Sequence, residues 1–498
     1  MWVLILLFLG AFCLYYKKNF VRPPNFPPGP FNYPILGGIP AIGQNVLTGM
    51  NRLQSQYGKI FSVYMGTDRT VVIADYDLAK EALNKDEFCI RPDIKALNDI
   101  RYPDENGQVR GVMFSNGDEW LEVKRFALRH LRDFGFGRIG MEALIWKKYN
   151  GVSSFFKEDV GKEVCLNLKL NIPILNALWH IISGEKLDYN DEHLLDIVHK
   201  VDVMMTTIDV SSVINLFPWL KYICPEATGY SKTINAYLGI RKLIEQQYHT
   251  HLETFQEGHM RDFMDVYIQE MKSQNQNSKS YLHGQRGLEN MNSLLSDLFV
   301  AGSDTTTNTL NWTIFYLAKD VAKQRRLQNE IDTVIGQDRE PSLQDKPDLP
   351  YLEAIVQEVH RISALGYLGV PRITGKDTQL GGYDIPKGTR IFTHIYHIMH
   401  DKDYWTNPDE FMPERFLDKN GKFQMDERSI PFGIGKRQCL GKTLAQNELF
   451  LFIAGLFQTF NFNFPKDKPV PNLEPIPGFV LACPPYNVVM SLRVKHSK

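Results

Sequence analysis

The sequence is poor in cysteine: 498 residues contain only six, and no two of them form a CxxC pair. A disulfide scaffold is therefore excluded, and such sparse thiols are typical of a cytosol-facing protein. Neither sign of charge is in excess, because the chain has 56 basic and 57 acidic side chains. The overall charge gives no reason to expect a nucleic-acid partner, although a local basic face stays possible. Aromatic residues make up 12% of the chain, which argues against disorder and against a coiled coil.

Long apolar runs are also rare, and the one present lies at the N-terminus. Residues 2–16 read WVLILLFLGAFCLYY, and Lys17, Lys18 and Arg22 follow. The run is short for a bilayer core of ~30 Å, but flanking residues and local thinning can supply the difference. The positive charges behind it favour a cytoplasmic body. We expect an uncleaved membrane anchor over residues 1–22; the alternative is a cleaved signal peptide, although no charged n-region or cleavage site is visible.

Residues 23–30 read PPNFPPGP, which predicts a stiff, extended hinge behind the anchor. Beyond it we find no second linker, so residues 31–498 are expected to form one large domain. An alternating pattern with a Gly-Thr-Asp turn predicts a β-hairpin over residues 59–74. Helical periodicity dominates residues 120–365, and strand-like segments return near residues 382–395 and at the C-terminus. The pattern predicts a mainly α fold with small β-sheets.

The strongest chemical signal lies in residues 432–441, which read FGIGKRQCLG. The glycines permit a tight loop, and Cys439 falls where a helical pattern resumes. Backbone N–H donors and the helix dipole favour a thiolate at such a position. A thiolate is one of the few protein ligands for haem iron, and Arg437 can neutralise a haem propionate. Cysteine and glycine alone would fit a buried structural thiol better, but the ten-residue pattern favours the ligand.

This pattern resembles the haem-binding signature of the cytochrome P-450 superfamily, the haem-thiolate monooxygenases. Four further motifs occur elsewhere in the chain in the family's order, so the resemblance covers essentially the whole chain. It implies the haem-thiolate fold, with haem b bound by residues that include Phe432 and Arg437, and with Cys439 as the axial iron ligand. Residues 261–265 (RDFMD) and the PPGP of the hinge are similar to the animal microsomal branch, and the chain resembles its arthropod members.

Residues 301–306 (AGSDTT) interrupt an otherwise apolar helical run with an acid and alcohols. Threonine hydroxyls in a helix can bond to the carbonyl four residues back and distort the helix. The resemblance assigns catalytic roles to Asp304 and Thr305, as the acid–alcohol pair that relays protons to iron-bound dioxygen.

Glu358 and Arg361 form an ExxR motif, whose i, i+3 spacing places the two side chains on one helix face. Taken alone, the motif would indicate an exposed ion pair of ~0.3–0.5 kcal/mol. With residues 413–416 (PERF), it resembles the family's buried Glu–Arg–Arg network, in which Arg415 is the third member. We expect a structural role for this network.

Trp120 and Lys124 lie at i, i+4 of a helix and can face one object. The resemblance places them at a haem propionate, with Lys124 in a position where the family usually has arginine. A lysine keeps the charge but loses the bidentate fork. Arg372 stands where many relatives have a propionate-binding histidine, so it is assigned to the haem as well. On another face of the same helix lie arginines that form either a solvated stripe or a docking surface for an acidic reductase: Arg125, Arg129 and Arg132.

Two other patterns predict no site. Residues 135–140 (GFGRIG) fit a dinucleotide-binding fingerprint but lack the preceding strand, so we expect a loop. The spacing of His394, His397 and His400 suits a metal, yet structural histidines are the more common explanation of such spacing.

The resemblance implies an NADPH-dependent monooxygenase that inserts one atom of O2 into a lipophilic small molecule. No nucleotide-binding unit is visible, so a separate reductase, NADPH–cytochrome P-450 reductase, is the expected electron donor. The body would lie on the cytoplasmic side of the endoplasmic reticulum membrane. Terpenoid or steroid hormone precursors and xenobiotics are candidate substrates, with epoxidation of methyl farnesoate as one example. The alternatives are an isomerase or dehydratase of the same fold, which works without a reductase, and a non-catalytic haem-binding sensor.

Overall fold

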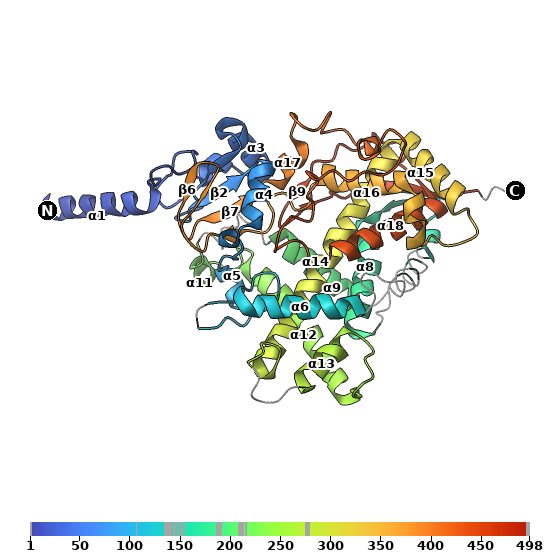
Figure 1. Cartoon of the computed structure of the whole chain (residues 1–498), viewed down its shortest axis with the longest axis horizontal. Helices are drawn as coiled ribbons and strands as arrows, with labels where there is room; N and C mark the ends of the chain where they lie inside the picture. Colours follow the sequence, from blue (N-terminus) through green and yellow to red (C-terminus); the bar gives the residue numbers. More distant parts are fainter. Residues whose placement is uncertain are drawn as a thin grey trace.

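The longest helix, α14 (Gly284–Lys319), runs through the middle of the molecule (Figure 1). Its side chains are buried on all faces along most of its length, as expected of a core helix. Around it pack α8 (Leu166–Ser183), α12 (Tyr230–Thr254), α16 (Pro350–Ser363) and α18 (Lys442–Thr459). α14 is therefore the central helix of the helical body.

The computed structural model describes residues 2–105, 107–133, 142, 146, 149, 153–154, 156–185, 192–207, 214, 217–273 and 279–494. The other described α-helices are α1 (Trp2–Phe20), α2 (Ile39–Ile42), α3 (Val46–Tyr57), α4 (Tyr76–Asn84), α5 (Lys95–Asn98), α6 (Gly117–Asp133), α9 (Glu192–Thr207), α11 (Leu220–Ile223), α13 (Phe263–Ser273), α15 (Val321–Val334) and α17 (Ile395–His400). Short 3-10 helices are η1 (Asp86–Phe88), η2 (Leu343–Asp348) and η3 (Pro413–Phe416). The predicted mainly α fold is confirmed.

The described part of the chain also contains four small sheets. The largest has the order β1-β2-β7-β4, with β1 (Ile60–Ser62) and β2 (Thr70–Ile73) antiparallel and β2 parallel to β7 (Arg390–Thr393). The predicted hairpin over residues 59–74 is therefore confirmed. The remaining described strands are β3 (Glu163–Cys165), β4 (Arg372–Ile373), β5 (Thr378–Leu380), β6 (Tyr383–Ile385), β8 (Phe460–Asn463), β9 (Ile476–Pro477), β10 (Leu481–Ala482) and β11 (Asn487–Leu492).

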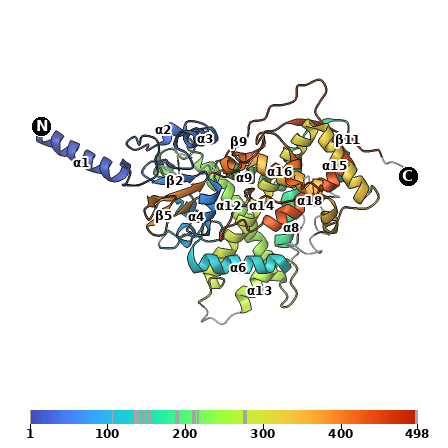
Figure 2. The same ribbon diagram turned by 45° about the horizontal axis from the view of Figure 1, so that its top comes forward.

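The N-terminal helix α1 extends away from the body on the side of β2, and α15 lies at the opposite end (Figures 1 and 2). Its apolar side chains are exposed, and it is the one described helix that is both long and apolar enough to cross a membrane. The helix continues to Phe20, so at ~1.5 Å per residue its 19 residues span ~28 Å. The helix contains the whole apolar run of residues 2–16 and lies within the anchor expected over residues 1–22.

The proline-rich segment after α1 is packed onto the largest sheet. The backbone N–H of Ser62 in β1 donates to the carbonyl of Pro28 (2.6 Å), and its hydroxyl donates to the carbonyl of Pro27 (2.7 Å). Phe26 is buried in the hydrophobic cluster of this sheet. The segment thus joins α1 to the body through hydrogen bonds to its backbone carbonyl groups. Proline has no backbone N–H donor, but its carbonyl still accepts hydrogen bonds.

The predicted Glu–Arg–Arg network is present and buried. Arg361 donates to Glu358 through Nε (2.7 Å) and Nη2 (2.9 Å), and both side chains are fully buried. Arg415 donates to the same carboxylate through Nε (3.0 Å). Nη1 of Arg361 donates to the carbonyl of Met399 (2.8 Å), which leaves the buried charge well compensated. The network joins α16 to η3 and to α17.

Candidate functional site

The loop that carries Cys439 is shaped by glycines with positive φ. Gly433 has φ +66° and Gly435 has φ +76°, values that other residues rarely adopt. A Cβ on Gly435 would lie 2.2 Å from the carbonyl oxygen of Leu83, so no larger residue fits. The backbone N–H of Cys439 donates to the carbonyl of Phe432 (3.0 Å) and closes the loop. Cys439 is thereby fixed three residues before α18 begins.

The thiol of Cys439 is exposed although protein surrounds it closely. Burial raises the pKa of this thiol, and the backbone N–H groups of Gly441 and Lys442, which donate to the sulfur, offset only part of that increase. The N–H donors at the helix start favour the thiolate, as the sequence predicts, but burial outweighs them, so the pKa of the thiol is raised overall. The thiol is accessible, and a bound metal would deprotonate it.

Arg437 projects from the same loop toward the start of α6. Its Nε donates to the carbonyl of Cys89 (3.0 Å), and its Nη2 donates to the carbonyl of Ser115 (2.8 Å) and to Oδ1 of Asn116 (2.9 Å). Its Nη1 is buried and has no hydrogen-bond partner among the residues that the structure describes. One end of this guanidinium is thus held in place while the other retains a free donor.

Two further buried arginines lie beside Arg437. Arg372 contacts the loop through Nη2, which donates to the carbonyl of Ile434 (3.4 Å). Arg91, which the sequence analysis missed, donates through Nη1 to the carbonyls of Val370 (2.6 Å) and Pro371 (2.9 Å). These two carbonyl groups lie 279 and 280 residues further along the chain, so no local sequence pattern could have identified Arg91.

The three arginines form a largely buried positive cluster that has no carboxylate partner among the described residues. Burial lowers the pKa of Arg372 to about 10. Burial also lowers the pKa of Arg437 to about 10, against the raising effect of the neighbouring Cys89 thiol, and repulsion from Arg372 adds a smaller decrease. The pKa of Arg91 is lowered well below its usual range by burial and by repulsion from the other two. Their described hydrogen-bond partners are carbonyl and amide oxygens, not carboxylates. Buried charge of one sign is costly unless an anion binds there.

Trp120 and Lys124 on α6 join this cluster, as their spacing predicts. The guanidinium of Arg437 lies 3.6 Å from the centroid of the Trp120 ring, and Nζ of Lys124 lies 4.8 Å from it. Lys124 also donates to the backbone carbonyl of Lys436 in the cysteine loop. Burial, with repulsion from Arg437 added, lowers the pKa of Lys124.

These residues fit a haem. The donor set combines an accessible thiol with four cations, one of which has a buried N–H donor without a described partner. A haem offers what this set lacks: a metal for the sulfur and two carboxylates for the cations. The structure thus brings together six of the eight predicted site residues, namely Trp120, Lys124, Arg372, Phe432, Arg437 and Cys439.

The other two, Asp304 and Thr305, lie in the middle of α14 and have different partners. The Thr305 hydroxyl donates to the carbonyl of Ala301 (2.8 Å), the predicted bond to the residue four back, while α14 stays unbroken. Burial raises the pKa of Asp304 to about 7, and the charge of Asp202 on α9 adds to that increase. Asp304 can therefore gain and lose a proton near neutral pH.

Apolar segments meet beside α14. The N–H of Leu481 in β10 donates to the carbonyl of Leu365 (2.9 Å), and the N–H of Cys483 donates to Oδ1 of Asn308 on α14 (2.8 Å). Residues of the expected substrate segments belong to or pack against one hydrophobic cluster: Leu97, Val112, Leu298, Leu365, Val370, Phe479 and Cys483. The neighbourhood of α14 is thus suited to an apolar ligand.

The remaining sequence signals fall outside this site. His394 caps α17, and burial lowers its pKa to about 3. His400 is likewise buried with its pKa lowered to about 3, so structural histidines explain the spacing. Arg125 and Arg129 are exposed on α6. The Arg132 side chain and residues 135–140 lie outside the described part of the chain.

Known proteins resemble the chain over nearly its whole length. A sequence model of the cytochrome P450 family matches residues 27–490. Farnesoate epoxidase of Bombyx mori is 30% identical over 99% of this chain and 98% of that protein. Cytochrome P450 2L1 of Panulirus argus is 31% identical, with 95% and 96% covered. Human cytochrome P450 2J2 is 33% identical, with 93% and 91% covered.

Members of this family bind haem b through a cysteine thiolate. The chain belongs to the cytochrome P450 family and is a haem-dependent monooxygenase.

Proposed function

We propose that the protein oxidises a lipophilic small molecule beside α14, and that Cys439 would hold the haem iron there. The observation that carries this proposal is the buried cation cluster next to an exposed thiol. Arg437, Arg372 and Lys124 would hold the haem carboxylates, while Trp120 and Phe432 pack around the group. The bound haem supplies the activation of dioxygen.

The chain's own residues supply orientation and protons. Asp304, whose pKa is raised to about 7, holds a proton at its carboxyl group, and the Thr305 hydroxyl passes a proton toward the oxygen site. The apolar segments around α14 orient the substrate and exclude water. General acid catalysis of this kind contributes ~10²–10⁴-fold to a rate.

The electron donor is proposed to be NADPH–cytochrome P-450 reductase. Arg125 and Arg129 are exposed on α6, the helix that also carries Trp120 and Lys124, so a basic face lies close to the haem-binding residues. An acidic reductase would be attracted to such a face.

We propose the endoplasmic reticulum membrane as the location, with residues 1–22 as the anchor, 23–30 as the hinge and 31–498 as the haem-thiolate catalytic domain on the cytoplasmic side. The exposed apolar helix α1 and the basic residues at its C-terminal end support this orientation.

A terpenoid ester is the proposed example of a substrate. The name of the Bombyx mori relative states that it epoxidises farnesoate, and the apolar segments beside α14 suit a long apolar chain. Steroid precursors and xenobiotics are the other lipophilic classes for the same site.

The test is a reconstituted reaction of the full-length protein with haem, reductase, NADPH and a panel that contains methyl farnesoate, steroids and drug-like probes. Mass spectrometry should find a product heavier by one oxygen atom that depends on NADPH. A product of unchanged mass without NADPH would instead support an isomerase of the same fold. NADPH that is never consumed with any ligand would support a haem-binding sensor.

A further inference from the structure

Asn116 lies between two of the buried arginines of the Cys439 site and contacts both. Its Oδ1 accepts a hydrogen bond from the backbone N–H of Arg91 (2.7 Å) and another from Nη2 of Arg437 (2.9 Å). Its Nδ2 donates to the backbone carbonyl of Arg91 (3.0 Å). One amide group therefore fixes the backbone of one arginine and the guanidinium of the other.

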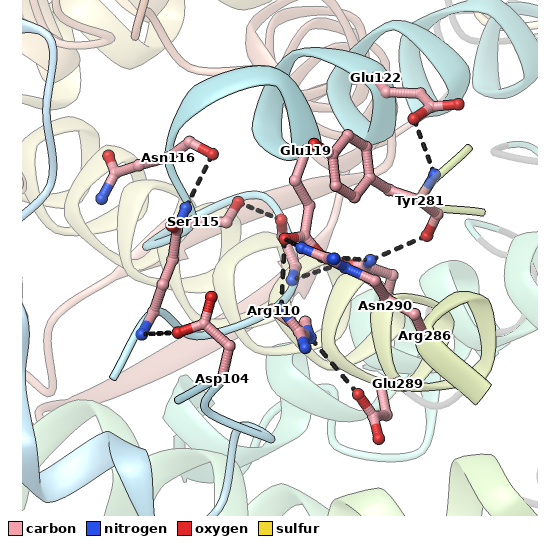
Figure 3. A network of polar contacts seen from close by, with 12 residues as sticks. Asp104, Arg110, Ser115, Asn116, Glu119, Glu122, Tyr281, Arg286, Glu289 and Asn290 are labelled. Carbon is pink, nitrogen blue, oxygen red and sulfur yellow. Dashed lines mark hydrogen bonds and ion pairs between the residues drawn. The ribbon is translucent and has the colours of Figure 1, made fainter. Parts of the chain in front are cut away.

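The backbone of Asn116 is itself anchored. Its carbonyl accepts from the N–H of Trp120 in the first turn of α6 (3.3 Å) and from Nε2 of Gln108 (2.9 Å). The backbone N–H of Gln108 in turn donates to Asp104 (2.9 Å), which places these residues in one network (Figure 3). Asn116 thus belongs to an ordered junction.

The same junction is tied to α14 through Glu119, one residue before Trp120. Glu119 is buried and accepts from Nη2 of Arg286 (2.7 Å), Nδ2 of Asn290 (2.7 Å) and Nη1 of Arg110 (3.2 Å) (Figure 3). Both Arg286 and Asn290 lie in the first turns of α14. The start of α6, and Asn116 with it, is therefore held by packed helices.

The Asn116 side chain is uncharged, and this distinguishes it from a carboxylate at the same position. An aspartate has nearly the same shape and would accept the same two hydrogen bonds, but it would lose the donation to the Arg91 carbonyl and would also neutralise Arg437. A neutral amide orients the guanidinium and leaves its charge, and the unused Nη1 donor, for another anion.

We propose that Asn116 is a positioning residue: held on the backbone of Arg91, it aligns the guanidinium of Arg437 toward the haem carboxylates without compensating its charge. The inference rests on the proposed role of Arg437 at the haem. In this role Asn116 acts through Arg437.

The test uses the full-length holoenzyme with Asn116→Asp. Transfer of haem to excess apomyoglobin should become about tenfold faster, equivalent to ~1.4 kcal/mol, because the introduced carboxylate competes with the haem carboxylate for Arg437. The reduction potential of the haem should become more negative, because an added negative charge favours the ferric state. The matched control is Asn45→Asp: Asn45 caps α3 by accepting from the N–H of Thr48 (3.0 Å), and aspartate caps equally well, so neither quantity should change.

Two more variants decide between explanations. Asn116→Ala removes the hydrogen bonds without adding charge, so it should speed haem loss with a smaller shift of the reduction potential. If Asn116→Asp does not fold, the haem loss of Asn116→Ala tests the inference in its place. A lower unfolding midpoint with unchanged haem loss and potential would overturn the inference, because Asn116 would then be merely structural. If Arg437→Ala speeds haem loss but neither Asn116 variant does, the inference about Asn116 is wrong and the proposed role of Arg437 stands. If Arg437→Ala also has no effect, the proposed role of Arg437 falls together with it.

Discussion

The substitution Glu358→Gln should destabilise the fold severely. The Glu358 carboxylate accepts from Arg361 (2.7 and 2.9 Å), from Arg415 (3.0 Å) and from the backbone N–H of Met412 (2.8 Å), and it is fully buried. Glutamine keeps the shape but turns one acceptor into a donor that faces N–H groups, and it leaves two guanidinium charges without a counter-ion. Breaking a buried ion pair in this way costs ~3–5 kcal/mol, against a total stability of ~5–15 kcal/mol for typical domains.

The assay is a urea titration followed by tryptophan fluorescence, since Trp405 lies 5.5 Å from the guanidinium of Arg361 and reports on the network. Glu81→Gln is the matched control, because Glu81 pairs with Lys85 (2.6 Å) on an exposed helix face and such pairs contribute ~0.3–0.5 kcal/mol. A Glu358→Gln protein within ~1 kcal/mol of the parent would refute the argument that this network is a buried, charge-compensated support.

The remaining predictions concern α14 and the cysteine loop. Product formation should decline as the pH rises through about 7, because Asp304 loses its proton there; Asp202→Asn should move this decline to lower pH, since it removes a charge that raises the pKa of Asp304. Thr305→Ala should reduce product formed per NADPH consumed. Thr313→Ala, which removes a hydroxyl with the same kind of bond further along α14, should leave that ratio unchanged. Gly435→Ala should prevent recovery of haem-loaded protein, because left-handed backbone costs ~1–2 kcal/mol and its Cβ would meet a backbone carbonyl at 2.2 Å.

Local sequence patterns predicted what depends on near neighbours. The hairpin over residues 59–74, the i, i+3 pair of Glu358 and Arg361, and the Thr305 hydroxyl bond follow from spacing alone. The resemblance to a family added Arg415, which lies more than 50 residues away along the chain.

What the sequence could not predict depends on burial and distant contacts. The pKa of the Cys439 thiol is raised because burial outweighs two N–H donors, and the balance of these effects is visible only once the surrounding chain is in place. Arg91 and Asn116 belong to no recognisable motif. Arg91 is positioned by the carbonyls of Val370 and Pro371, and Asn116 contacts Arg437, in each case across more than 270 residues of the chain.

The proposal that Cys439 holds the haem is tested most directly by the absorption spectrum of the reduced, carbon-monoxide-bound protein, compared with that of Cys439→Ala. The parent protein should give the thiolate-type spectrum from which the family takes its name, and the variant should lose it while Cys89→Ala, which removes a thiol next to Arg437, retains it. A thiolate-type spectrum in the Cys439→Ala protein, or its absence in a folded, haem-loaded parent, would contradict the assignment.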